Sequence, residues 1–124
     1  MARLLWVFLA GGVGSCVRYG TVTLTERFFG QSYPWGVFGV NVVGSFLIAL
    51  VMVLAVTKAS ISEDVRIALT AGFLGGLTTY SSFNQDTLKL LDGKQYATAA
   101  LYVGTTLVVC LVAGVLGTAL GRRI

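Results

Sequence analysis

The chain contains no histidine, one proline and only two cysteines among its 124 residues. Cys16 and Cys110 are each isolated inside an apolar run. Without histidine, they form no recognisable zinc, haem or Cys/His catalytic pattern and no disulfide framework. We therefore expect both cysteines to be small packing residues. The single proline excludes a proline-rich disordered segment.

Charged residues are also scarce, and they lie mostly in the gaps between apolar runs. They make up 11% of the chain, against roughly 25% in an average soluble protein, and the mean hydropathy is +0.84. This composition excludes a soluble enzyme domain. The excess of nine Lys and Arg over five Asp and Glu is placed to face water or lipid headgroups, so it does not predict nucleic-acid binding.

Four apolar runs predict an all-α membrane protein, because a spanning helix needs about 20 mostly apolar residues. The expected spans cover 4–25, 34–57, 66–90 and 96–121, within a single four-helix transmembrane domain over 1–124. The joints, such as 57–64, are short, so neighbouring helices must alternate in direction and both termini must lie on one side. The 16 glycines, nearly twice the average share of about 7%, are expected at close helix contacts.

The N-terminus and the basic residues bear on orientation. The start MARLLWVFLAGGVGSC imitates a secretory signal, but the apolar run continues past Arg18 to Thr25, so we expect this segment to be retained.

Five Lys and Arg lie on the side of the termini and three on the opposite side. This weak bias is compatible with insertion in both orientations and antiparallel pairing, and also with one fixed orientation.

Polar residues interrupt the third apolar run. Its apolar part, 67–77, is too short to cross a bilayer, and TTYSSFNQDT follows at 78–87. Glycines weaken the helix before Thr78 and Thr79, whose hydroxyls can satisfy freed backbone groups. The pattern predicts a break at mid-membrane, where broken helices often hold ion sites. The glycines Gly72 and Gly76 alone would indicate only a tight helix crossing.

Two further helices carry polar side chains within their spans. Asn41 lies in the second run, and Tyr102 and Thr106 share a face of the fourth. Each is compatible with helix packing alone, but together they would line a narrow path with amide and hydroxyl donors, which suit a small hydrated anion. Arg18 would add positive potential at one end, snorkel to the interface or pair with Glu26.

Three segments resemble the Fluc/CrcB family of fluoride channels: GGVGSCVRY at 11–19, PWGVFGVNVVGSF at 34–46 and GFLGGLTTYSSFNQD at 72–86. The resemblance extends over the whole chain, and GGLTT followed by two aromatics three residues apart is its most specific part. It implies passive, selective export of fluoride across the inner (plasma) membrane, with fluoride and the lipid bilayer as partners. It also implies an antiparallel, dual-topology homodimer with two pores and a structural sodium ion (Na+) at its centre.

The resemblance implies roles for individual residues as well. The backbone carbonyls of Gly75 and Thr78 would bind sodium, and Arg18 and Asp86 would lie in the vestibules. The expected pore-lining residues are Asn41, Tyr80, Ser81, Ser82, Phe83, Tyr102 and Thr106.

Three positions depart from the pattern of the family. Tyr80 stands where a phenylalanine is expected, so its added hydroxyl could donate to fluoride or turn away. Asp86 stands in place of a glutamate, and Cys110 in place of a serine, which weakens the polar track along the fourth helix.

Two other functions are open on the sequence. A small multidrug-type transporter shares the four-helix, dual-topology design, but it needs a membrane-embedded carboxylate, usually in the first helix, where this chain has Arg18. A nonconducting assembly subunit would need only the glycine-rich faces, and the polar break argues against it. The chain has no phosphate-binding glycine loop, so we expect neither a nucleotide-driven pump nor an enzyme.

Overall fold

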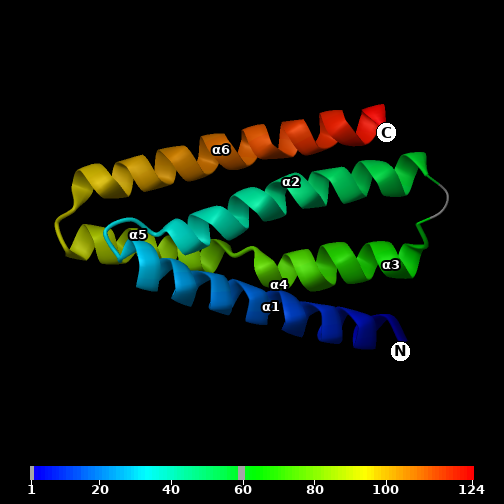
Figure 1. Cartoon of the computed structure of the whole chain (residues 1–124), viewed down its shortest axis with the longest axis horizontal. Helices are drawn as coiled ribbons and strands as arrows, with labels where there is room; N and C mark the ends of the chain where they lie inside the picture. Colours follow the sequence, from blue (N-terminus) through cyan, green and yellow to red (C-terminus); the bar gives the residue numbers. More distant parts are fainter. Residues whose placement is uncertain (1, 59–60) are drawn as a thin grey trace.

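The computed structural model describes residues 2–58 and 61–124, and every regular element in these ranges is helical (Figure 1). Met1 lies outside the described residues, and so do Ala59 and Ser60 of the joint predicted at 57–64. The elements in chain order are α1 (Ala2–Phe29), α2 (Trp35–Thr57), α3 (Glu63–Ile67), the π-helix η1 (Ala68–Leu74), α4 (Gly75–Leu77), α5 (Tyr80–Asp92) and α6 (Tyr96–Arg123).

Three of these helices, α1, α2 and α6, are long and apolar enough to cross a membrane. Many of their large apolar side chains are exposed, among them Phe8 at 75%, Val56 at 83% and Leu111 at 71%. Such a surface would aggregate in water but faces lipid readily in a bilayer. The chain is therefore an all-helical, multi-pass membrane protein, as its composition predicts.

The helices run back and forth along one axis. Both termini and the start of α3 lie at one end of the molecule, whereas the α1–α2 loop and the α5–α6 turn lie at the other (Figure 1). Helix α1 extends beyond the predicted span 4–25, since it continues past Thr25 to Phe29. It ends at Gly30, whose φ of +76° is the left-handed conformation that terminates many helices.

Glycine brings the helices into backbone contact. A side-chain carbon at Gly14 of α1 would overlap the carbonyl oxygen of Phe73, so α1 lies directly against η1. A side-chain carbon at Gly117 of α6 would likewise overlap the carbonyl oxygen of Phe46 on α2. Both contacts follow the small-residue packing of membrane helices that the glycine content predicts.

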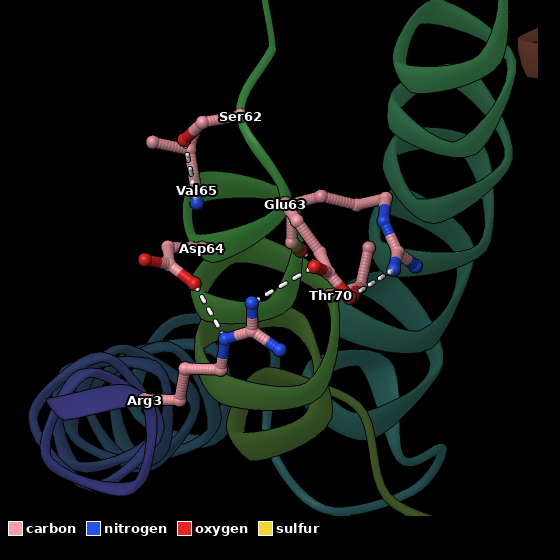
Figure 2. Close-up of polar contacts among 7 residues, drawn as sticks. Arg3, Ser62, Glu63, Asp64, Val65 and Thr70 are labelled. Atoms are coloured by element: carbon pink, nitrogen blue, oxygen red, sulfur yellow. Dashed lines mark hydrogen bonds and ion pairs between the residues drawn. The ribbon is translucent and has the colours of Figure 1, made fainter. Parts of the chain in front are cut away.

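A charged cluster joins α1 to α3 at the end that holds the termini (Figure 2). Arg3 Nε donates to Asp64 Oδ1 at 2.7 Å, and Arg3 Nη2 donates to Glu63 Oε2 at 2.8 Å. Ser62 begins α3 by accepting the backbone N–H of Val65 at 3.3 Å. Arg3 therefore links the first turn of α1 to the first turn of α3 through both acidic side chains.

Candidate functional site

The third predicted span is interrupted at two residues. Helix α4 ends at Leu77, Thr78 (φ −84°, ψ 152°) and Thr79 (φ −157°, ψ 122°) are extended, and α5 begins at Tyr80. The Thr79 hydroxyl caps α5 by accepting the backbone N–H of Ser82 at 3.2 Å. The position of this break at mid-membrane stays a prediction.

Asn41 on α2 bonds the backbone that the break exposes. Its Nδ2 donates to the Thr79 carbonyl at 3.2 Å, and its Oδ1 accepts the Thr79 N–H at 2.8 Å. Both backbone groups would otherwise be costly to bury in a membrane. A side chain at Gly44 would overlap the methyl group of Thr78, so only glycine lets α2 approach the break this closely.

The break also releases backbone carbonyls from the helical pattern. In a continuous helix, the carbonyl of Gly75 would accept the N–H of Thr79, four residues on. The carbonyl of Thr78 would accept the N–H of Ser82 in the same way. Those N–H groups bond instead to the side chains of Asn41 and Thr79. The two carbonyls are thus available to another partner, and unwound carbonyls of this kind are known sodium ligands.

A groove of about 330 Å³ lies beside the break, with walls from α2, α5 and α6. It collects an amide, several hydroxyls and two aromatic rings from different parts of the chain. The predicted pore residues that line it are Asn41, Tyr80, Phe83 and Thr106.

Two hydroxyls at this site are buried without a hydrogen-bond partner. Tyr102 is 0% exposed and Thr106 is 6% exposed. Within the described residues, neither Tyr102 Oη nor Thr106 Oγ1 forms a hydrogen bond. Burying an unpaired polar group costs about 1–3 kcal/mol, and such groups in folded proteins often mark a functional role. Thr106 lines the groove, and Tyr102 lies one helical turn before it on α6.

Arg18 and the two serines do not line the groove. Arg18 Nε donates to the Gly76 carbonyl at 3.1 Å, and Arg18 Nη1 donates to Ser82 Oγ at 3.3 Å. Arg18 therefore connects α1 to both sides of the break. Ser81 is exposed, and its hydroxyl lies 3.1 Å from Thr79 Oγ1. Neither serine is among the residues that line the groove.

Asp86 lines a different cavity, of about 220 Å³, beside the α1–α2 loop. Its Oδ1 lies 4.0 Å from Lys89 Nζ, and its side chain is 20% exposed. Glu26, one of the partners considered for Arg18, lines this same cavity and accepts a hydrogen bond from Gln31 Nε2 at 3.5 Å. Arg18, the other vestibule residue predicted from the sequence, is not among the residues that line this cavity.

Two features have no counterpart in the sequence predictions. The π-helix η1 occupies a stretch expected to be α-helical, and no residue pattern marks it. Tyr33, in the α1–α2 loop, contacts Tyr102 with ring centroids 5.4 Å apart. Its neighbour Pro34 indicated only a loop.

Known proteins resemble the chain over its whole length. A family model described as "CrcB-like protein, Camphor Resistance (CrcB)" matches residues 5–118. A Sorangium cellulosum relative named "Fluoride-specific ion channel FluC" is 43% identical over 124 residues, which cover 100% of this chain and 98% of the relative. Relatives of the same name are 47% identical in Anaeromyxobacter sp. (strain K), covering 98% of this chain and 97% of the relative, and 39% identical in Geobacter metallireducens, covering 100% of both. The chain therefore belongs to the CrcB family.

Proposed function

We propose that the protein is a fluoride-selective channel through which fluoride leaves the cell passively across the plasma membrane. Relatives named as fluoride-specific ion channels match it from end to end, which supports the proposal. The observation that carries it is the pair of buried hydroxyls, Tyr102 Oη and Thr106 Oγ1, which form no hydrogen bond within the described residues. Hydroxyl donors of this kind can replace the water that a small anion loses on entering a pore.

The chemistry of the groove favours an anion. None of the residues that line the 330 Å³ groove is acidic. Asn41 uses one amide hydrogen on the Thr79 carbonyl, and its second hydrogen, which has no partner within the described residues, can bond an anion. The ring edges of Tyr80 and Phe83 add partial positive charge. An anion in this groove therefore meets donors and no carboxylate.

Passive export follows from the charge of the ion. Hydrogen fluoride enters a cell by diffusion and ionises inside, and a membrane potential that is negative inside drives the resulting anion outward. Each elementary charge gains about 2.3 kcal/mol per 100 mV.

The two predicted vestibule residues carry charges near the proposed path. Arg18, bonded to Gly76 and Ser82, places a positive charge beside the break. Asp86 lines the cavity near the α1–α2 loop.

An antiparallel homodimer with sodium at its centre completes this proposal. In the single chain Gly75 is exposed and Tyr80 is 78% exposed, so one surface of the break is open to a second copy. Two copies related by a two-fold axis would direct the carbonyls of Gly75 and Thr78 from both subunits at one cation. Sodium would then hold the subunits together. Tyr80 and the exposed Ser81 would meet the partner.

No specific observation favours the multidrug-type transporter. Such a transporter needs a carboxylate deep in the membrane to exchange protons with its substrate. Here Glu26 and Asp86 both line the cavity beside the α1–α2 loop, at one end of the molecule.

Removing the two hydroxyls tests the proposal. In liposomes, Tyr102→Phe and Thr106→Val should each lower fluoride efflux by about tenfold, as expected when one hydrogen bond to an ion is lost. The Tm of both variants should stay the same or rise, because each substitution removes a buried polar group that the folded chain leaves unpaired. A structural role would instead lower the Tm.

Thr118→Val is the matched control. The Thr118 hydroxyl donates to the Gly114 carbonyl at 3.0 Å within α6 and does not line the groove beside the break. This variant should keep its full fluoride efflux. Full efflux in Tyr102→Phe and Thr106→Val as well would contradict the proposed path.

A further inference from the structure

Tyr33 lies in the α1–α2 loop but is hydrogen-bonded to α6. It sits between Gly30, which ends α1, and Pro34, which precedes α2. Its Oη lies 2.6 Å from Thr105 Oγ1. The Thr105 hydroxyl donates its only hydrogen to the Leu101 carbonyl at 2.6 Å, so Tyr33 is the donor in its bond with Thr105. The α1–α2 loop is thereby attached to the turn of α6 that contains Tyr102.

The ring of Tyr33 also fixes the ring of Tyr102. The two rings meet edge to face, with centroids 5.4 Å apart and an interplanar angle of 87°, which is a favourable aromatic geometry. On another side, the Tyr102 ring contacts Phe83 at a centroid distance of 5.2 Å. Because Tyr102 is completely buried, its orientation, and so the position of its hydroxyl, depends on the side chains packed around it, and these two rings are among them.

One buried cluster of side chains connects the linings of the two cavities. Tyr33 and Leu90 line the 220 Å³ cavity beside the α1–α2 loop. Phe83 and Thr106 line the 330 Å³ groove beside the break. The buried core cluster that includes Tyr102 contains both Leu90 and Phe83, and Tyr33 packs against it. Tyr102 itself lines neither the cavity nor the groove, but it packs in the buried cluster that contributes a lining residue to each of them.

We propose that Tyr33 is a positioning residue for conduction: its ring, anchored by Thr105, holds the Tyr102 hydroxyl where it donates to fluoride passing between the cavity and the groove. This inference rests on the proposed function as a fluoride channel. The α1–α2 loop then sets the geometry of a pore donor that belongs to another helix.

A double-mutant cycle tests whether Tyr33 acts through the Tyr102 hydroxyl. Tyr33→Leu should lower fluoride efflux from liposomes by about tenfold in the otherwise unmodified chain. In a Tyr102→Phe chain it should lower efflux by no more than about twofold further, because the hydroxyl that it positions is already absent. Equal losses in the two backgrounds, as a general structural role would give, would overturn the inference. So would full efflux in the Tyr33→Leu single variant.

Milder variants keep the test available if Tyr33→Leu does not assemble. Tyr33→Phe and Thr105→Val remove the two partners of one hydrogen bond and keep the Tyr33 ring. Each should lower efflux by about two- to fivefold, and the double variant should be no worse than either single variant. Additive losses would overturn the inference. Tyr96→Leu is the control, because Tyr96 is 63% exposed at the start of α6, and it should keep full efflux.

The two proposals fail in different ways. An unmodified protein that passes no fluoride overturns the proposed function and this inference with it. An unmodified protein that passes fluoride, with full efflux in every Tyr33 and Thr105 variant, overturns the role of Tyr33 alone.

Discussion

At the scale of single residues, polar side chains determine what the helix break can do. The sequence left two interpretations of Asn41, a bond to a neighbouring helix or a place in the pore. The structure shows the first, since Asn41 bonds both backbone groups of Thr79. One of its amide hydrogens has no partner among the residues that the structure describes, and the pore role stays a prediction. Arg18 also has defined partners, because it donates to the Gly76 carbonyl and to the Ser82 hydroxyl.

The aromatic pair Tyr80 and Phe83 gives a prediction at this scale. Three-residue spacing predicts similar faces for the two rings, but Tyr80 is 78% exposed whereas Phe83 is 8% exposed and belongs to a core cluster. If the Tyr80 ring edge is what matters, Tyr80→Phe should keep fluoride efflux within about threefold and leave the Tm unchanged, because the ring remains. Phe83→Ile should lower efflux and Tm together, because it removes buried packing.

Efflux and Tm measured on both variants decide between these roles. A loss of efflux by tenfold or more in Tyr80→Phe would contradict the role of the ring edge. It would identify the Tyr80 hydroxyl as the donor, with a loss of about 1–3 kcal/mol typical of such a bond.

At the scale of elements, the third predicted span, 66–90, shows best which local features the sequence predicts and which it does not. The polar run after Leu77 and the glycines before it predict the extended residues Thr78 and Thr79, because local sequence both weakens the helix and supplies capping hydroxyls. The π-helix η1 could not be predicted in this way. It lies against α1 at Gly14 and Gly72, so its geometry depends on contacts between segments far apart in the sequence.

The contribution of Asn41 to the break is testable through stability. Asn41→Ala leaves the N–H and carbonyl of Thr79 without their partner, and a lost buried hydrogen bond costs about 1–3 kcal/mol. We expect a lower Tm for the purified protein. Asn84→Ala is the control, because Asn84 is exposed on α5, and its Tm should not change. Equal Tm values for the two variants would mean that Asn41 does not hold the break.

At the scale of the whole molecule, hydropathy was sufficient to predict an all-helical membrane protein. Apolar runs predicted the helices, and short joints predicted the alternation that places both termini at one end (Figure 1). The contact between Tyr33 and Tyr102 could not be predicted, because it depends on how a loop folds over the start of α6. The single chain also leaves the break partly uncovered at Gly75 and Tyr80, in keeping with the proposed dimer.

Ion efflux from liposomes that contain the purified, unmodified protein tests the proposed channel most directly. Ion-selective electrodes would follow fluoride and chloride after a potassium ionophore provides the compensating charge movement. We expect rapid fluoride efflux that needs no proton gradient, and chloride efflux equal to that of protein-free liposomes, because an ordered donor shell and pore width select the ion. Comparable efflux of both anions, or fluoride efflux that stops when the proton gradient is removed, would contradict a fluoride-selective channel.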